Sequence, residues 1–453
     1  MRQADKQLAM LLGVVLSGCT TYGKVVNEPK LTLDTEDTYS LTTAANRVNK
    51  GEITVAIAMS GGGTRAAALS YGVMKALRDT SLKADQPSIP VLDEVDFISS
   101  VSGGSFTAAY YGLYGNKLFE DFEQDFLYYS VSDDLFSRVL SPRTWFTTGG
   151  RTQRTIDYYD ANIFYGATFA DMNRSGRPIV VINASDLGGG IRFSFLQEYF
   201  DLLCSDLSTY PVANAVTASS AVPLVFNPVV LRNHEGCEQS QLIELSSSDE
   251  GKAHTRHTVE GLKSYQDKYD RTFIHLVDGG ITDNLGLLSF YDVIESSGGG
   301  EAFFKRIGAK PSPHFVMIVV DASTSPDFEM EGSTKEPTIR ETLSAMTDIQ
   351  LHRFNDASKS LFERTMERWA TILSTEDVKM STYFVDINLQ DVTNIKKKHY
   401  LNQVPTDLSL EPEQVDALIE EGYQQLMQNE SFKAFLSQYR DEDENLPYAL
   451  NDE

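Results

Sequence analysis

The feature that most constrains the fold is a strand, a glycine turn and a helix, in that order, occurring twice in succession. The apolar, β-branched run Ile53–Ala58 ends at Ser60-Gly61-Gly62-Gly63, and Val95–Ser99 leads in the same way into Ser102-Gly103-Gly104. Helical spacing of apolar residues follows each turn, over Arg65–Leu77 and Ser105–Tyr114. Repetition of this unit is typical of a parallel sheet covered by helices. We therefore expect an α/β fold, a three-layer α/β/α arrangement with a mainly parallel central sheet.

Further buried strands are expected at Pro178–Ile182, Thr272–Val277 and Phe315–Val320. Between the second helix and Pro178, the aromatic-rich stretch Phe119–Phe169 should supply helix core, with a minority of its rings free to line an acyl pocket. After Asp321 the pattern turns helical. We expect one catalytic domain over residues 51–325 and a mainly helical extension over 326–453 that packs on the same domain.

The N-terminus has the pattern of an export signal. Arg2 and Lys6 precede the apolar run Leu8–Leu16, which is too short to span a bilayer as a stable helix. The run continues into Leu16-Ser17-Gly18-Cys19, which resembles the lipobox of bacterial lipoproteins, where the cysteine is lipidated. We expect a signal peptide over 1–18, lipidation at Cys19 and a polar tether over 19–50. The mature protein would then be lipid-anchored in the bacterial cell envelope, at the periplasmic face of the outer membrane.

The charge balance excludes some partners. The chain has 39 Lys plus Arg against 64 Asp plus Glu, a net charge of -25. Nucleic acid requires a basic stripe, and the single basic run, Lys396–His399, is too short to provide one. The same acidity repels anionic bilayers, so we expect membrane contact to depend on the lipid anchor.

Two cysteines remain after Cys19. Cys204 and Cys237 are an even pair in a compartment that would be oxidising. They could stay separate thiols, but Cys237 lies in a polar, turn-rich segment that a crosslink would help to order. We favour a disulfide between them.

The first chemical motif is a nucleophile turn. A serine attacks an ester when its hydroxyl stands clear of the sheet beside a base and near oxyanion donors. Ser100-Val101-Ser102-Gly103-Gly104 fits the hydrolase elbow G-x-S-x-G in its strand, turn and helix context, except that Ser100 replaces the first glycine. That position requires a small residue, so serine is a tolerable departure. Ser102 is the candidate nucleophile, and Gly103 and Gly104 support its turn.

The second motif is Gly61-Gly62-Gly63-Thr64-Arg65. Glycines at the start of a helix direct backbone N–H groups toward negative charge, as an oxyanion hole requires. The same glycines fit a loose dinucleotide fingerprint, but no acidic strand end follows and the phosphate-loop Lys-Ser/Thr pair is missing. We expect an oxyanion hole and no bound nucleotide.

The third motif is Asp278-Gly279-Gly280, which follows the strand expected at Thr272–Val277. A carboxylate at a strand's carboxyl end lies at the rim where parallel sheets place their sites. Asp278 could take the Ser102 proton directly, provided that burial raises its pKa.

Together, Gly61–Arg65, the Ser102 elbow and Asp278-Gly279-Gly280 resemble the patatin-like phospholipase family, whose members use a Ser-Asp dyad without a histidine. Ala218–Pro228 is also similar to a family segment, and the likeness covers about Ile53 to Leu287. The resemblance implies a lipid acyl hydrolase, of phospholipase A or lysophospholipase type, that needs no cofactor. Ser102 would form an acyl-enzyme, Asp278 would act as base, and the amides of Gly61, Gly62 and Gly63 would hold the oxyanion, with help from Arg65. Membrane lipid would be the substrate.

Other functions stay open at this point. A Ser-Asp-His triad could use His314, His352 or His399, although no local pattern marks any of them. His254 and His257 have metal-ligand spacing but no third ligand nearby, so we expect no metal. A catalytically inactive lipoprotein that serves as a lipid-binding or envelope assembly module is the alternative to an enzyme, and a scaffold has no need of Ser102 and Asp278 together.

Overall fold

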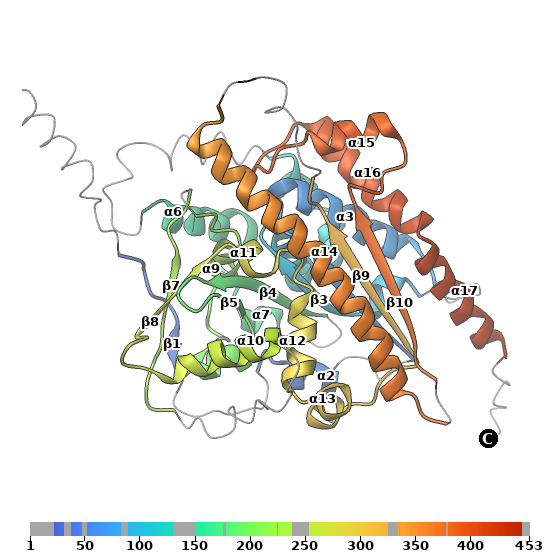
Figure 1. Ribbon diagram of the computed structural model, residues 1–453, viewed down its shortest axis with the longest axis horizontal. Coiled ribbons are helices and arrows are strands. Elements are labelled where there is room, and N and C mark those ends of the chain that lie inside the picture. Colours follow the sequence, from blue (N-terminus) through green and yellow to red (C-terminus); the bar gives the residue numbers. More distant parts are fainter. Residues whose placement is uncertain are drawn as a thin grey trace, which may run out of the picture.

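The computed structural model describes residues 22–30, 38–47, 52–82, 89–129, 150–174, 178–223, 225–237, 253–324, 334, 336–376 and 379–445. Within them, an eight-stranded sheet lies between helices (Figure 1), in the order β10-β9-β2-β3-β4-β8-β7 with β5 paired to β4. Its strands are β2 (Ile53–Met59), β3 (Val95–Val101), β4 (Ile179–Asp186), β5 (Ile191–Ser194), β7 (Val229–Arg232), β8 (Phe273–Val277), β9 (His314–Asp321) and β10 (Ser381–Asn388). The short strands β1 (Glu28–Pro29) and β6 (Ser205–Asp206) pair separately.

The sheet is parallel through its centre and antiparallel at one side. The pairs from β10 through β9, β2 and β3 to β4 are all parallel, whereas β5, β8 and β7 join in antiparallel pairs. The expected α/β class and mainly parallel sheet are therefore confirmed. The extension after Asp321 is not only helical, because Ser381–Asn388 adds β10 as an edge strand of the same sheet.

Alternating burial explains why helices cover both faces. In β2, Val55, Ile57 and Met59 belong to the larger hydrophobic core, while Ala56 and Ala58 belong to a smaller core on the opposite face. Because successive side chains of a strand point to opposite faces, a strand that is apolar at every position must be covered by helices on both faces of the sheet.

The helices that surround the sheet are α2 (Leu41–Arg47), α3 (Gly63–Asp79), α4 (Gly103–Tyr114), α6 (Gly150–Tyr159), α7 (Phe169–Met172), α8 (Gln197–Leu202), α9 (Val212–Ser219), α10 (Ala253–Lys263), α11 (Gly280–Asp283), α12 (Leu288–Ser296), α13 (Gly300–Ile307), α14 (Ile339–Leu373), α15 (Ile395–Asn402), α16 (Pro412–Gln428) and α17 (Glu430–Asn445). The long helix α14 crosses one face of the sheet, and α3 and α16 lie on the other (Figure 1).

Two glycines bring α3 and α16 into close contact. A Cβ added at Gly72 would lie 2.1 Å from the carbonyl oxygen of Ile419, and one at Gly422 would lie 2.3 Å from that of Leu69. Such an approach leaves no room for a side chain at either position. The C-terminal helices thus pack directly on the helix that begins at the glycine loop.

Part of the segment expected to be a tether is folded onto the domain. Asn27 is buried and bonds to Ser205 and Arg232, and the buried Tyr39 hydroxyl donates to the carbonyl of Val180 at 3.0 Å. The domain therefore includes residues before 51. Cys19 and residues 1–18 lie outside the described part, and among the described residues no helix combines the length and apolar character needed to cross a bilayer.

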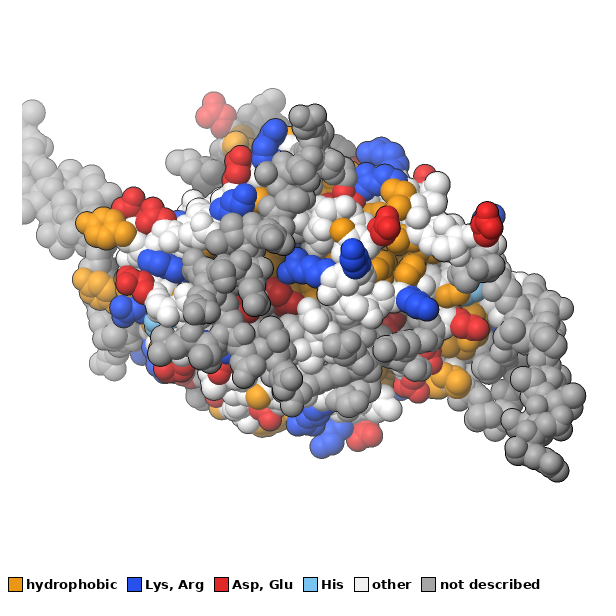
Figure 2. All heavy atoms as spheres, turned by 90° about the horizontal axis from the view of Figure 1, so that it is seen from below, with side chains coloured by type: hydrophobic (Ala, Val, Ile, Leu, Met, Phe, Trp, Pro, Cys, Tyr) orange, Lys and Arg blue, Asp and Glu red, His pale blue; other side chains and the backbone are white. Residues whose placement is uncertain are grey.

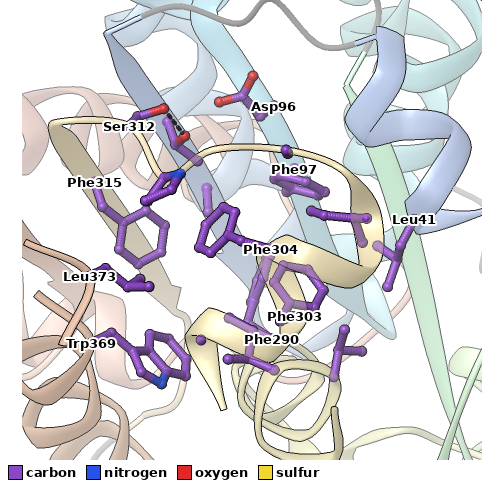
Figure 3. Close-up of a pocket in the computed structure, with 18 of the residues that line it drawn as sticks. Leu41, Asp96, Phe97, Phe290, Phe303, Phe304, Ser312, Phe315, Trp369 and Leu373 are labelled. Carbon is purple, nitrogen blue, oxygen red and sulfur yellow. Dashed lines mark hydrogen bonds between the residues drawn. The ribbon is translucent and has the colours of Figure 1, made fainter. Parts of the chain in front are cut away.

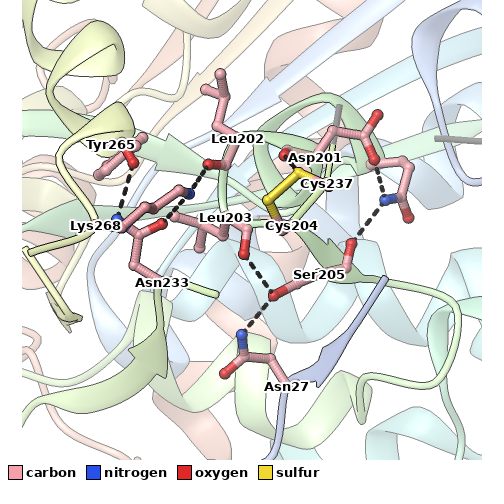
Figure 4. Close-up of a disulfide and its surroundings, with 11 residues drawn as sticks. Asn27, Asp201, Leu202, Leu203, Cys204, Ser205, Asn233, Cys237, Tyr265 and Lys268 are labelled. Atoms are coloured by element: carbon pink, nitrogen blue, oxygen red, sulfur yellow. Dashed lines mark hydrogen bonds between the residues drawn. A yellow bond between two sulfur atoms is a disulfide. The ribbon is translucent and has the colours of Figure 1, made fainter. Parts of the chain in front are cut away.

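The structure joins Cys204 to Cys237 in a disulfide, with the two Cα atoms 5.5 Å apart (Figure 4). The pair lies in a hydrogen-bonded region beside β6, where Asn27 Nδ2 donates to Ser205 Oγ at 2.7 Å and Lys268 Nζ donates to the Leu202 carbonyl at 2.7 Å. The crosslink ties the segment after β7 to the end of α8.

The aromatic stretch contributes mainly to the core, as expected. Phe122, Phe126 and Tyr159 are buried, whereas Tyr128 and Tyr129 are exposed; Trp145 and Phe146 lie outside the described residues. Seen from below (Figure 2), acidic and basic side chains are interspersed, and a hydrophobic patch lies right of centre beside Lys and Arg side chains. The net negative charge therefore does not form one continuous acidic face on this side.

Candidate active site

Ser102 occupies a tight turn between β3 and α4. Its backbone has φ 48° and ψ -118°, a conformation that residues other than glycine rarely adopt. The two following glycines make the turn feasible, since a Cβ at Gly103 would lie 1.9 Å from the Gly63 carbonyl oxygen and one at Gly104 would lie 2.7 Å from that of Ser60. The turn has the strand-to-helix geometry of a nucleophile elbow.

Ser100, which replaces the first glycine of the elbow motif, fits without distortion of the motif. Its side chain is fully buried, and its hydroxyl donates to the carbonyl of Val181 on the neighbouring strand at 3.3 Å. The sheet therefore accommodates Ser100 in place of the first glycine of the G-x-S-x-G pattern, with its hydroxyl hydrogen-bonded.

Asp278 follows β8 and faces Ser102. Ser102 is close enough to this carboxylate to favour its charged form, and the Gly280 amide donates to Asp278 Oδ1 at 2.8 Å. Burial nevertheless raises the pKa of Asp278 to about 6. At neutral pH the carboxylate is mostly ionised, yet it is more basic than an exposed aspartate.

Ser219, at the end of α9, connects the two halves of this pair. Its hydroxyl accepts from the Ser102 amide at 2.8 Å and donates to the Asn183 carbonyl at 2.6 Å. Its carbonyl accepts from the Gly279 amide at 3.0 Å, and the Ala221 carbonyl accepts from the Asp278 amide at 3.0 Å. Ser219 belongs to the family-like segment 218–228, but no local sequence pattern indicates this bridging role.

The glycine loop comes from the end of β2 and lies against the elbow. The Gly61 amide donates to the Asn284 carbonyl at 2.9 Å, so it is not available to an oxyanion, contrary to expectation. Within the described residues, the amides of Gly62, Gly63 and Gly103 donate no hydrogen bond. These three amides are the available donors beside Ser102.

Arg65 has a different position from the one expected. Its guanidinium is buried and donates to the carbonyls of Ala322 and Val404, at 2.8 and 2.6 Å, and to Thr406 Oγ1 at 2.9 Å. The next residue of that segment, Asp407, accepts from the Thr64 amide at 2.8 Å. Arg65 therefore holds the segment between α15 and α16 against the glycine loop, and its donors are occupied by protein atoms.

Asn284 is a second residue that sequence reasoning did not single out. Its carbonyl holds Gly61, and its side chain donates to Ser323 Oγ at 3.4 Å. Asn355 of α14 also donates to Ser323 Oγ, at 3.0 Å. Asn284 thus connects the glycine loop, the turn after Asp278 and the helix that crosses the sheet.

The candidate histidines do not complete a triad. Within the described part of the chain, no histidine is hydrogen-bonded to Ser102 or Asp278. His314 is buried at the amino end of β9, where its ring stacks on Tyr383, and His399 is exposed on α15. His254 is bonded to Asp292 at 2.9 Å, and the described residues contain no group of three or more His, Cys, Asp or Glu side chains placed to hold a metal.

The arrangement combines a serine in a strained turn, a carboxylate of raised pKa and backbone amides without a hydrogen-bond acceptor among the described residues. Ser102 and Asp278 are 7 % and 9 % exposed, so the pair is accessible from solvent but largely enclosed. These are the groups that covalent acyl transfer requires.

One comparison with known proteins identifies the family of this chain. The family profile described as patatin-like phospholipase matches residues 57–291, which include the glycine loop, Ser102 and Asp278. The solved structure of human GIVD cytosolic phospholipase A2 aligns with 92% of this chain and 68% of its own, at 12% identity and a TM-score of 0.42. VipD from Legionella pneumophila aligns with 94% of this chain and 73% of its own, at 11% identity and a TM-score of 0.33. A sequence comparison with curated proteins gave no match.

Proposed function

Because this chain belongs to the patatin-like phospholipase family and is a lipid hydrolase, we propose that it cleaves acyl esters of glycerophospholipids or lysophospholipids with Ser102 as nucleophile and Asp278 as base. One observation carries the proposal: Ser102, in its strained strand-to-helix turn, lies beside the buried Asp278 carboxylate, whose pKa burial raises to about 6. Three unoccupied glycine amides lie beside it and support the same assignment.

Acylation follows from these positions. Asp278 accepts the Ser102 proton as Oγ attacks the ester carbonyl, and the new oxyanion accepts hydrogen bonds from the amides of Gly62, Gly63 and Gly103. The intermediate then expels the alcohol, which takes the proton from Asp278. Ser102 retains the acyl group as an ester.

Deacylation uses the same groups with water in place of the alcohol. Asp278 accepts a proton from the attacking water, the glycine amides again hold the oxyanion, and the proton returns to Ser102 Oγ as the ester bond breaks. The product is a free fatty acid. Arg65 and Ser219 take no part in the bond changes and act as positioning residues.

We also propose that Cys19 carries the lipid that holds the enzyme at the periplasmic face of the outer membrane. The lipobox-like Leu16–Cys19 and the preceding apolar run support this proposal, and two or more acyl chains would give stable attachment. Labelled palmitate should enter the wild-type chain and be absent from Cys19→Ser, with the label in the outer-membrane fraction. An unlabelled wild-type chain would rule out the anchor.

The enzymatic proposal is tested by fatty-acid release from mixed phospholipid vesicles. We expect release by the wild-type chain, with Ser102→Ala and Asp278→Asn at background. Ser297→Ala and Asp157→Asn, which alter the same residue types away from the site, should match wild type. If wild type is silent on phospholipid, lysophospholipid and short esters alike, a lipid-binding or assembly module replaces the enzyme as the explanation.

A further inference from the structure

A cavity of about 540 Å³ lies at the edge of the sheet opposite to Ser102. Thr54, Asp96 and Phe315 line it near the amino ends of β2, β3 and β9, whereas Ser102 follows the carboxyl end of β3. The walls come from α12, α13 and the C-terminal end of α14. This cavity is therefore separate from the dyad.

The cavity leaves aromatic side chains uncovered where a sheet normally buries them. Phe97 and Phe315, which lie on inner strands, are only half-buried, and so are Phe290 of α12 and Phe303 and Phe304 of α13. Protein interiors are close-packed, so an apolar space of this size is not a normal feature of a core. A pocket volume between about 300 and 1,000 Å³ with mostly apolar walls is typical of a small-molecule site.

Two polar side chains lie together at one end of the cavity (Figure 3). Asp96 and Ser312 lie at that end, Trp369 lies at the other, and phenyl rings lie between them. Asp96 Oδ2 accepts from the Val55 amide at 3.0 Å, while within the described residues Oδ1 accepts no hydrogen bond. The Thr54 and Ser312 hydroxyls pair at 2.8 Å, and Lys310 also lines the cavity.

This distribution fits a ligand with a long apolar tail and one small polar head. Burial raises the pKa of Asp96 to about 8, so at neutral pH its carboxyl group is mostly protonated and can donate a hydrogen bond to an oxygen of the head. Lys310, two residues before Ser312, is the lining residue that carries a positive charge.

We propose that this cavity binds one molecule of long-chain free fatty acid, with its chain among the phenyl rings and its carboxyl group near Asp96 and Lys310. The choice of a fatty acid rests on the proposed function, because fatty acid is the product that the dyad would release. The site is non-catalytic, since the sheet separates it from Ser102.

Trp369 provides a direct probe, because the chain has two tryptophans and Trp145→Phe leaves Trp369 alone. We would titrate the full chain carrying Ser102→Ala and Trp145→Phe with nitroxide-labelled stearic acid and follow Trp369 fluorescence. We expect saturable quenching that unlabelled stearic acid reverses. The Ser102→Ala background makes the measurement independent of hydrolysis.

Two variants should fill the cavity and one should not. Val293→Phe on α12 and Ala309→Phe after α13 place a ring in the space, and each should raise the half-quenching concentration by about tenfold or more. Ile372→Phe, at an exposed position of α14 beside Leu373, should leave it unchanged. Circular dichroism identifies any variant that fails to fold. If one of the two filling variants does not fold, the titration of the other tests whether stearic acid binds in the cavity.

Absence of quenching, or equal quenching in wild type and in a folded filling variant, would overturn the proposal. Quenching by nitroxide-labelled lysophosphatidylcholine with none by labelled stearic acid would overturn it as well. If Trp369 fluorescence is quenched as expected but the wild-type chain releases no fatty acid from any ester, the binding site stands and the proposed enzymatic function is wrong.

Discussion

The hydroxyl of Ser219 accepts a 2.8 Å hydrogen bond from the backbone amide of Ser102. The carbonyl of the same residue accepts from the Gly279 amide at 3.0 Å, next to Asp278. One residue therefore positions both the turn at Ser102 and the turn that follows Asp278. These two hydrogen bonds hold the turns at Ser102 and Asp278, which are far apart in sequence, next to each other.

Loss of the Ser219 hydroxyl should impair turnover. In Ser219→Ala the Ser102 amide and the Asn183 carbonyl lose their shared partner, and we expect kcat to fall about 10- to 100-fold with KM little changed. Ser219→Thr, which keeps a hydroxyl, should recover part of the loss. The control is Ser220→Ala, because Ser220 bonds within α9 to Val216. Equal kcat values for Ser219→Ala and wild type would refute the bridging role.

Activity should rise with pH through the pKa of Asp278. Only the ionised carboxylate can accept the Ser102 proton, so kcat/KM should increase to a plateau with a midpoint near about 6. A profile of kcat/KM between pH 4 and 9 on an uncharged short ester checks this. A midpoint near pH 4 would mean that burial does not perturb this carboxyl group.

The same pKa shift predicts that Asp278 destabilises the folded protein at neutral pH. Because the folded pKa lies above the ordinary value of 3.8, the favourable contribution is complete below that value and is lost as pH rises through about 6. Asp278→Asn should thus be more stable than wild type at pH 8, by about 1–3 kcal/mol, with little difference at pH 3.5. Urea denaturation at the two pH values measures the effect, and a variant less stable at pH 8 would contradict it.

Arg65 should affect activity by holding the glycine loop in position, and not by binding a charged group of the substrate. Arg65→Lys cannot reproduce the bonds to Ala322, Val404 and Thr406, and we expect the free energy of unfolding to fall by about 2–4 kcal/mol. The loss of kcat should be the same on phospholipid and on an uncharged ester. Arg78→Lys, on the same helix and paired with Asp79, is the control. A defect confined to phospholipid substrates would place Arg65 on the lipid phosphate instead.

The disulfide should stabilise the fold without serving catalysis. The crosslink between Cys204 and Cys237 spans a sequence separation of 33, for which loop-closure entropy amounts to about 3–4 kcal/mol. We expect Cys237→Ser to lose about 2–4 kcal/mol of stability in urea denaturation and to keep wild-type kcat at 25 °C. Reduction of the wild-type chain should have the same effect. No change in stability would show that the crosslink is absent in solution.

The central strands and the three motifs could be predicted because their signals are local. Buried runs such as Ile53–Ala58 are apolar at consecutive positions, and the glycines at Gly61 and Gly103 mark where each strand turns into a helix. The family profile matches the region that these motifs occupy. The assignments of Ser102 and Asp278 remain predictions that the experiments above test.

One local signal was overlooked, and two other features depended on contacts that no local pattern contains. The edge strand Ser381–Asn388 alternates, with Tyr383, Val385 and Ile387 buried, so it carried a strand signal within a region of strong helical pattern. Tyr39 joins the domain because its hydroxyl reaches Val180, and Arg65 turns to the segment around Thr406. Those partners are distant in sequence, so the roles of these residues became evident only from the fold.

The role of Ser102 is tested most directly by treating the chain with a long-chain fluorophosphonate and mapping the modified residue by peptide mass spectrometry. We predict one adduct on Ser102, none in Ser102→Ala and strongly slowed labelling in Asp278→Asn. An adduct on another residue, or fatty-acid release by Ser102→Ala at the wild-type rate, would contradict it.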